Sequence, residues 1–407
     1  MIHKLFSKKE LKLLWPFYTN SFMMILFFVI PFMVVHFSSL GFSATQIGLL
    51  FAVWPLGSLL FEIPTGAIAD IYGRKFSVIS GGLLMGIFLT LIYFFQSYWI
   101  IMILLALVGI SQTLTTGSRE AWVVDLLNAN KMEKFQKSFF AKSYSIANIG
   151  VVISGLLGAF LVSNFGLKII WFAGGLSFFI SSFFLSFAQE KYKKQKTNLK
   201  DSMKEVVKQS KTSIKFGYRH PVLFYLFIIT FLFAISFSIR GFVAWTPFLT
   251  SLNFPKIGFG YLWSALGIMG IIAPLLSNKF SKENKEKKTL ITISFIFIFL
   301  GIIIFFSNNL IILLASFLCL SFTNGFRVPI REVYFQRFIP SKLRATVGSI
   351  RSLIIGISSI IGLTVSGLIV DAIGGRYAII IALSLMIPVI ILYLMIKEDK
   401  IKTKIRK

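Results

Sequence analysis

The sequence predicts an all-α membrane protein of about twelve transmembrane helices, arranged as two pseudo-symmetric six-helix bundles with both termini in the cytoplasm. Three observations support this prediction. The 407 residues are 56% hydrophobic, long apolar stretches recur along the chain, and basic side chains gather in alternate connections. A soluble core does not need so much apolar side chain, so most of it is expected to face lipid.

Each predicted helix is an apolar stretch that is long enough to cross the hydrocarbon core, which takes about 20 residues at a rise of 1.5 Å each. In the first half we expect spans at 13–37, 45–71, 76–96, 98–127, 138–164 and 168–188. In the second half we expect spans at 222–250, 257–280, 288–307, 309–338, 343–372 and 375–396. The short outer connections make neighbouring helices tight antiparallel hairpins.

The net charge of +27 would suggest nucleic acid as the partner of a soluble protein, but the positions of the charges indicate membrane topology instead. Most Lys and Arg lie at the termini, or in and beside alternate loops, and only Lys168, Lys256 and Arg376 lie in the intervening connections. This asymmetry follows the positive-inside rule. It predicts a multi-pass protein of the inner (plasma) membrane that contacts anionic lipid of the inner leaflet and binds no nucleic acid.

The longest polar segment, 189–220, carries ten Lys and Arg and is expected to be a basic cytoplasmic linker. It separates an N-terminal six-helix bundle at 1–188 from a C-terminal six-helix bundle with a basic tail at 221–407. Two interpretations of the linker stay open, namely an amphipathic helix on the inner leaflet and a solvated tether.

A duplication relates the two halves. The sequence Arg-Glu-Ala-Trp at 119–122 corresponds to Arg-Glu-Val-Tyr at 331–334, which lies 212 residues later. The same order of basic, acidic, small and aromatic residues in the fourth helix of each half implies two repeats related by an axis along the membrane normal. Such repeats place a central site between the two bundles.

The most specific segment is Glu-Ile-Pro-Thr-Gly-Ala-Ile-Ala-Asp-Ile-Tyr-Gly-Arg-Lys at 62–75, between the second and third spans. Here the chain resembles the major facilitator superfamily. The signature of that family in this loop is Gly, three residues, Asp, two residues, Gly, Arg, and then Arg or Lys. This chain matches the signature without a mismatch, at Gly66, Asp70, Gly73, Arg74 and Lys75. The helix count, the duplication and the central linker also fit the family.

The resemblance implies a secondary active transporter, not an enzyme, that carries a small molecule by alternating access. It implies that Asp70 stabilises the outward-facing state at an inner gate by pairing with a buried arginine, for which Arg351 is the candidate by position. We expect Gly66 to allow close helix packing and Gly73 to allow a tight turn. Arg74 and Lys75 are expected to face the inner leaflet, and a purely topological role is the alternative.

Carboxylates within the predicted helices are candidates for proton coupling, because a carboxylate at such a depth is costly unless it is paired or protonated. The four are Glu62, Glu120, Asp125 and Glu332. We rank Glu62 first, since its spacing places it near one helix face with Gly66 and Asp70. The structural alternative for Glu62 is a salt bridge to Arg119.

Arginines within the predicted helices form a second group of candidates, as a substrate or charge network. They are Arg119, Arg240, Arg327, Arg331 and Arg351. The competing interpretation is that they pair with the carboxylates and form an inner gate. Arg240 differs from the others, because it lies near mid-depth beside Gly241 and shortly before Pro247. An arginine next to expected helix breaks is a candidate anion-binding or coupling residue.

Three functions stay open at this point. The preferred one is proton-coupled export of a small molecule or drug, since the residues from Glu62 to Lys75 resemble those of a tetracycline-efflux subgroup of the family. The second is import or exchange of an organic anion held by Arg240, and the third is a non-transporting receptor on a carrier scaffold. The sequence has no phosphate-binding loop and no cluster with metal-ligand spacing, so we expect no cofactor, no metal and no ATP-driven transport. Protons are the expected coupling ion, and a monomer is the expected state.

Overall fold

The structure is a computed structural model that describes residues 6–190, 220–280, 285–340 and 343–397. Most described residues are helical, the rest lie in turns or irregular connections, and no strand occurs among them. Eleven helical segments of this described part are long and apolar enough to cross a membrane, which confirms an all-α, multi-span membrane protein. The number twelve and the cytoplasmic position of the termini stay predictions.

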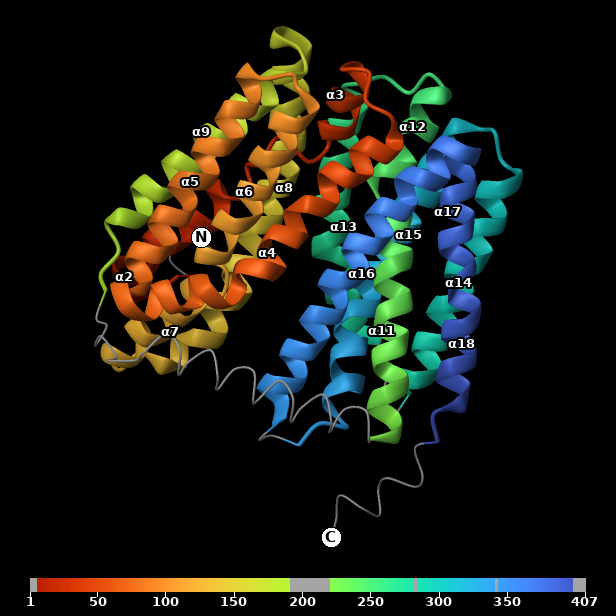
Figure 1. Ribbon diagram of the computed structural model, residues 1–407. Helices are drawn as coiled ribbons and strands as arrows, with labels where there is room; N and C mark the ends of the chain where they lie inside the picture. Colours follow the sequence, from red (N-terminus) through yellow and green to blue (C-terminus); the bar gives the residue numbers. More distant parts are fainter. Residues whose placement is uncertain (1–5, 191–219, 281–284, 341–342, 398–407) are drawn as a thin grey trace. The chain divides into compact units, whose positions relative to one another are not determined.

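The first half of the chain supplies eight α-helices and one short 3₁₀ helix, Glu133–Phe135, among its described residues. The α-helices are α2 (Lys8–Met23), α3 (Met33–Ser39), α4 (Ala44–Tyr72), α5 (Arg74–Phe94), α6 (Tyr98–Thr115), α7 (Ser118–Ala129), α8 (Gln136–Phe165) and α9 (Ile169–Ser186). Figure 1 shows α5 lying along both α6 and α9.

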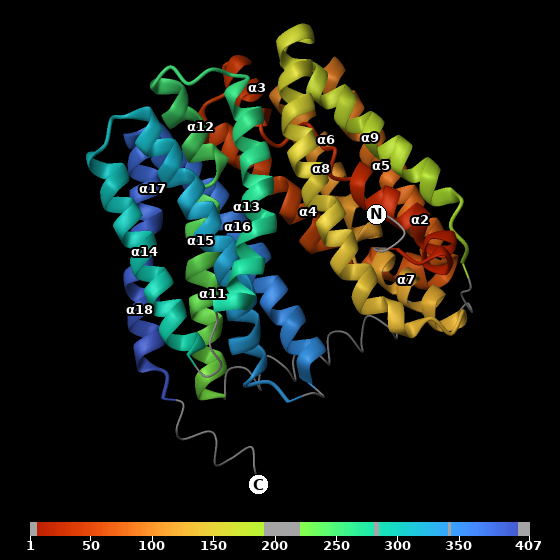
Figure 2. The same cartoon turned by 180° about the vertical axis from the view of Figure 1, so that it is seen from behind.

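The second half supplies eight more α-helices within the described ranges. They are α11 (Pro221–Ile239), α12 (Phe242–Ser251), α13 (Gly258–Phe280), α14 (Glu286–Phe306), α15 (Leu310–Gln336), α16 (Arg344–Ile373), α17 (Gly375–Ser384) and α18 (Met386–Met395). In Figure 2, which gives the view from behind, α14 lies beside α17 and α18.

Several predicted spans are interrupted. The first, expected at 13–37, is divided into α2 and α3 by the nonhelical residues between Met23 and Met33, and it is absent from the eleven candidate spans. The fourth divides between α6 and α7 at Gly117, whose φ of 75° is a conformation that favours glycine. The seventh divides at Arg240 and Gly241, which confirms the helix break expected beside Arg240.

The chain forms two compact units, which are described separately below. Unit 1 holds the described parts of Met1–Phe42, Val53–Met203 and Pro255–Ile268. Unit 2 holds the described parts of Ser43–Ala52, Lys204–Phe254 and Met269–Lys407. Each unit therefore contains a short segment from the other half of the sequence, the start of α4 in unit 2 and the first part of α13 in unit 1. The predicted linker falls largely outside the described residues, and its boundaries stay a prediction.

Unit 1 has an aromatic core at the end that carries α7. Trp122 is 1% exposed, and its ring meets that of Phe17 edge to face, with centroids 4.8 Å apart. The indole nitrogen of Trp122 donates to the carbonyl oxygen of Gln189 at 2.9 Å, so this buried N–H is satisfied. The core thus joins α2, α7 and the chain just after α9, and it holds the side chains of α7 in fixed positions.

Unit 2 contains the start of α4 pressed against α16. A Cβ at Gly367 would collide with the carbonyl oxygen of Ala44, so glycine is needed at this crossing. The hydroxyl of Ser366 donates to the carbonyl oxygen of Ile239 at 2.8 Å, at the last residue of α11. Hydroxyls and glycines therefore make the closest helix contacts here, as is common where lipid surrounds a bundle.

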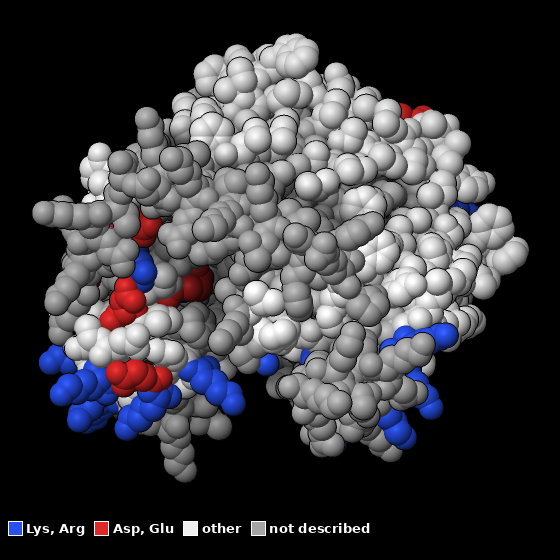
Figure 3. Space-filling model, turned by 60° about the horizontal axis from the view of Figure 1, so that its bottom comes forward, with Lys and Arg blue, Asp and Glu red and all other residues white. Residues whose placement is uncertain are grey.

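The connection between α7 and α8 in unit 1 carries basic side chains. Lys131, Lys134 and Lys137 are all exposed there. Figure 3 shows described Lys and Arg side chains along the lower rim of the view, with Asp and Glu side chains among those at the lower left. The arrangement agrees with the loop charges that the sequence analysis used to predict topology.

Candidate functional site

The turn between α4 and α5 carries the signature loop. Gly73 has a φ of 101° and a ψ of 153°, a region that only glycine occupies without strain. A Cβ at this position would also lie 3.1 Å from both carboxylate oxygens of Glu190. The tight turn expected at Gly73 is therefore confirmed, and a side chain at this position would be strained by its φ and would displace the Glu190 carboxylate slightly.

The two basic residues of the signature are bound within unit 1. Arg74 forms an ion pair with Asp125 of α7. The Nζ atom of Lys75 donates to the carbonyl oxygens of Ser186 and Ala188 at 2.7 and 2.9 Å, and its backbone N–H donates to Glu190 at 2.9 Å. A cation at the C-terminus of α9 complements the helix dipole. The expectation that this pair faces lipid was incomplete, because both side chains hold helix ends together.

The remaining residues of the expected inner gate lie on α4 and α16. No described heavy atom lies within 4 Å of a Cβ built at Gly66, so its role in close packing stays a prediction. Asp70 lies half-buried near the end of α4. The guanidinium of Arg351 donates to Glu332, with one contact of 2.8 Å. The pairing of Asp70 with Arg351 would connect the two units and also stays a prediction.

Three of the four candidate coupling carboxylates hold structural contacts. Glu120 accepts from the backbone N–H of Gly117 at 3.1 Å and so caps the start of α7. Asp125 is the partner of Arg74. Glu332 accepts from Arg331 at 2.7 Å, besides its pairing with Arg351. Each of these three carboxylates is therefore held by polar contacts within its own unit.

Glu62 differs from these three carboxylates. It lies on α4 ten residues before Tyr72, about 15 Å along the helix axis from that end. Its side chain is exposed, and this side chain has no ion pair or hydrogen bond to any residue within the described ranges. The alternative interpretation, a salt bridge from Glu62 to Arg119, is not found, because Arg119 binds elsewhere.

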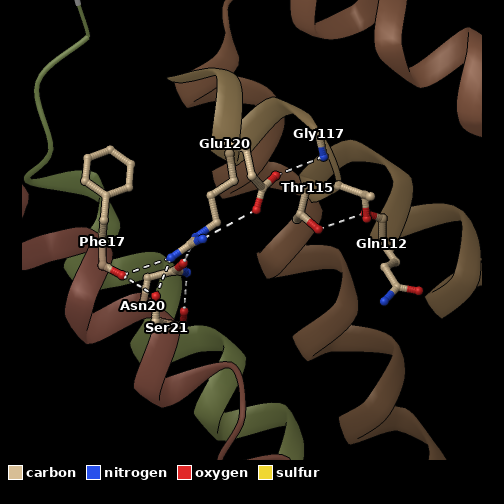
Figure 4. A network of polar contacts seen from close by, with 10 residues as sticks. Phe17, Asn20, Ser21, Gln112, Thr115, Gly117 and Glu120 are labelled. Atoms are coloured by element: carbon tan, nitrogen blue, oxygen red, sulfur yellow. Dashed lines mark hydrogen bonds and ion pairs between the residues drawn. The ribbon is translucent and has the colours of Figure 1, made fainter. Parts of the chain in front are cut away.

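Arg119 belongs to a buried polar network that joins α2, α7 and α9 (Figure 4). Its guanidinium donates to the side chains of Asn20 and Ser21, and to the carbonyl oxygen of Phe17 at 3.1 Å. The amide of Asn20 in turn donates to Ser181 of α9 at 2.8 Å. Figure 4 shows Phe17, Asn20 and Ser21 on one helix, with Glu120 and Gly117 opposite. Since its donors are used, Arg119 stabilises unit 1 and leaves little capacity for a substrate.

Unit 2 contains a cavity of about 250 Å³ between α11, α15, α16 and α18. Its polar lining comes from Arg327, Arg331 and Asn324 of α15, together with two hydroxyl residues. Its apolar lining is rich in aromatic rings: Phe233, Phe237, Tyr334, Phe335 and Tyr393. The sequence analysis identified the two arginines but not the aromatic residues, because aromatic side chains are frequent throughout this chain.

The arginines of the cavity have unused hydrogen-bond donors. Arg327 is 5% exposed, and its Nε has no acceptor in the described part of the chain. Its one hydrogen bond to a described residue is a long one of 3.5 Å to Asn324. The guanidinium carbon of Arg327 lies 3.3 Å from the ring centroid of Phe233. The Nε of Arg331 also lacks an acceptor among the described residues. Buried donors without acceptors are uncommon in native proteins and need an explanation.

Arg240 lies close enough to add its positive charge to that of Arg327. It is 7% exposed, and one of its terminal nitrogens has no acceptor within the described ranges. Its guanidinium lies 5.3 and 5.0 Å from the ring centroids of Phe237 and Phe297. The anion-binding role of Arg240 stays a prediction, and the arginines that line the cavity are Arg327 and Arg331.

The helical fold and the charges within its spans define a multi-span membrane transporter. The chain belongs to the Major Facilitator Superfamily, whose family model matches residues 17–302 and 285–407. The resemblance seen in the signature loop is therefore confirmed at the level of the family.

The chain is similar to several individual proteins, which differ in identity and in the share of the chain that they match. The uncharacterized MFS-type transporter YxaM of Bacillus subtilis (strain 168) is 24% identical over 386 residues, which cover 93% of this chain and 94% of YxaM. The multi-drug resistance efflux pump PmrA of Streptococcus pneumoniae serotype 4 is 25% identical over 270 residues, covering 61% of this chain and 63% of PmrA. The crystal structure of a mutant of the nucleoside transporter NupG has the same fold, with a TM-score of 0.75 at 14% identity, over 93% of this chain and 98% of NupG.

Proposed function

We propose that this chain exports a small molecule in exchange for protons, and that Glu62 carries the proton. The observation that carries the proposal is the state of Glu62 on α4. It is a carboxylate about 15 Å from the end of a membrane span, and no described residue pairs with it. No ion pair with a described residue therefore holds the Glu62 carboxylate, and we assign to it the uptake and release of the proton, whereas Asp125 and Glu332 are held in ion pairs with arginines.

The direction of transport is supported by one relative. PmrA of Streptococcus pneumoniae carries the name of an efflux pump, and it shares 25% of the residues in the matched region with this chain. Export against a concentration gradient needs an energy source, and proton entry supplies it when a carboxylate takes up a proton on one side of the membrane and releases it on the other.

The test uses purified full-length protein in liposomes with a pH-sensitive dye inside. Tetracycline, ethidium and 1-naphthoate are the probe compounds, and each is added under an imposed pH gradient. We expect at least one probe to start proton movement through the wild-type protein. Glu62→Gln should abolish this movement, because the amide cannot take up the proton. If none of the three probes starts proton movement, proton-coupled transport of these compounds is refuted.

Glu133→Gln is the matched control, since Glu133 is an exposed carboxylate on the short 3₁₀ helix outside the membrane core. It should move protons as the wild type does. Unchanged proton movement in Glu62→Gln, in protein that elutes as the wild type does, would refute the assigned role of Glu62.

A further inference from the structure

We propose that the cavity in unit 2 binds a small aromatic organic anion, whose acidic group is held by Arg327 and Arg331. The inference rests on the proposed transport function and names the class of its cargo. The unused donors of the two arginines bind an oxyanion, either a carboxylate or a phosphate. The aromatic side chains of the lining pack against the ring system of the same molecule.

The first step of the argument is the hydrogen-bonding capacity of the two arginines. A guanidinium has five N–H donors in a planar fork that fits the two oxygens of a carboxylate or phosphate. Among the described residues, Arg327 has only the long hydrogen bond to Asn324, and the Nε atoms of both arginines have no acceptor there. An oxyanion between them would satisfy both donors.

The second step is the balance of charge around the cavity. The positive groups that act on Arg327 are Arg331, Arg240 and Arg351. Glu332 is the carboxylate in contact with this group, and its two oxygens are already shared by Arg331 and Arg351. The contact with the ring of Phe233 compensates Arg327 only in part. An excess of positive charge inside a bundle is unfavourable until an anion enters.

The third step is the size and lining of the cavity. A volume of about 250 Å³ lies below the range of drug-sized sites, which begins at roughly 300 Å³, and so favours a one-ring or two-ring molecule. Phe233 and Phe335 line the cavity together with Tyr334 and Tyr393. Rings of this kind pack against an aromatic body in stacked or edge-to-face geometry. The combination of an arginine fork and aromatic walls therefore selects an aromatic acid over a sugar or an inorganic ion.

The charge of such a cargo also agrees with export. The membrane potential of a cell is negative inside, so it drives an anion outwards and opposes its entry. An exporter of an anion therefore gains from both the potential and the proton gradient, whereas an importer of the same anion would need protons to overcome the potential.

The test measures binding to the purified full-length protein, without any proton gradient. Four probes share one ring system: 1-naphthoate, 1-naphthyl phosphate, neutral 1-naphthalenemethanol and cationic 1-naphthylmethylamine. Selective ligands raise the melting temperature of the state that they bind. We expect one or both anions to raise it by several degrees, and the neutral and cationic probes to leave it unchanged. The stronger of the two anions identifies a carboxylate or a phosphate as the preferred acidic group.

Variants locate the site. Arg327→Gln and Arg331→Gln should each weaken binding of the better anion at least tenfold, because one side of the fork is lost. Arg376→Gln is the matched control, since its guanidinium contacts Asn308 at 2.6 Å and lies outside the cavity lining. It should bind as the wild type does. Ser359→Phe fills the cavity while it keeps every arginine, and it should abolish binding even if the arginine variants fold poorly.

The outcomes separate this inference from the proposed function. Glu62→Gln should bind the anion normally but move no protons, so loss of proton movement alone leaves the cavity assignment intact. Equal stabilisation by the neutral probe would overturn the inference, as would normal anion binding by Ser359→Phe. Anion binding together with unchanged proton movement in Glu62→Gln would refute only the coupling role of Glu62.

Discussion

The Oδ2 atom of Asp371, near the end of α16, accepts a hydrogen bond of 2.7 Å from the backbone N–H of Thr45, at the start of α4. Its Oδ1 atom accepts from the backbone N–H of Ala44 at 2.9 Å. Asp371 therefore caps a helix that begins more than 300 residues earlier in the chain. Both sides of this contact belong to unit 2, and a carboxylate at a helix N-terminus is stabilised by the free N–H groups and the dipole there.

Replacement of Asp371 by Ala is expected to loosen the first turn of α4. Loss of such a cap costs about 1 kcal/mol, which corresponds to roughly fivefold faster opening of that turn. Hydrogen exchange measured by mass spectrometry should show faster exchange in residues 44–50 of Asp371→Ala. Asp371→Asn keeps one acceptor oxygen and should exchange at an intermediate rate. Equal exchange in all three proteins would show that the contact does not hold the helix end.

Replacement of Gly73 by Ala is expected to destabilise unit 1. The φ of 101° is strained for alanine by about 1–3 kcal/mol, and the added Cβ would also press on Glu190. The melting temperature of the purified protein should therefore fall by several degrees. Gly66→Ala is the matched control, because Gly66 is helical and no described atom lies near its added Cβ, so its melting temperature should stay the same or rise. Equal losses in the two variants would contradict this explanation of the signature.

Glu10 is expected to make the stability of unit 1 depend on pH. It precedes the predicted first span and is 1% exposed. Burial alone would raise its pKa, but hydrogen bonds from Lys142, Tyr18 and Ser7 outweigh burial and hold the pKa below the ordinary value of 4.5. The ionised form is therefore favoured by folding, and this stabilisation is present above the ordinary pKa and is lost as the pH falls through the lowered one.

The measurement compares melting temperatures of the wild type and Glu10→Gln from pH 7 down to pH 4. The variant should be less stable at pH 7, and the difference should shrink as the pH falls below about 4.5, where protonation removes the advantage of the wild type. Glu133→Gln serves as the exposed control and should follow the wild type. A difference that stays constant down to pH 4 would show that the charge of Glu10 does not stabilise the fold.

Much of the fold follows from local chemistry in the sequence. Apolar length located eleven spans, and the glycine at 73 and the Arg240–Gly241 pair marked a turn and a helix break where the structure has them. The first span was predicted without its break, although Pro31 stands within the interrupted stretch. The length of an apolar stretch does not reveal such an interruption, because the residues around the proline are as hydrophobic as those of a continuous helix.

The candidate site was harder to predict, because its contacts join residues that are distant in the sequence. The apolar stretches placed Arg119 and Arg327 within predicted helices. They do not show that Asn20 and Ser21 accept hydrogen bonds from Arg119, or that the Nε of Arg327 has no acceptor among the described residues. The difference decides which arginine is structural and which is free to bind a ligand. The cap formed by Asp371 depends in the same way on packing between α4 and α16, which no local pattern in the sequence encodes.

The contacts of Lys75 have a mechanical consequence. Its Nζ donates to the carbonyl oxygens at the end of α9, and its backbone N–H donates to Glu190, at the start of the predicted linker. The signature loop is thus hydrogen-bonded to the residues at and just after the end of α9. A displacement of the chain at Glu190 is therefore expected to move the turn at Gly73 as well.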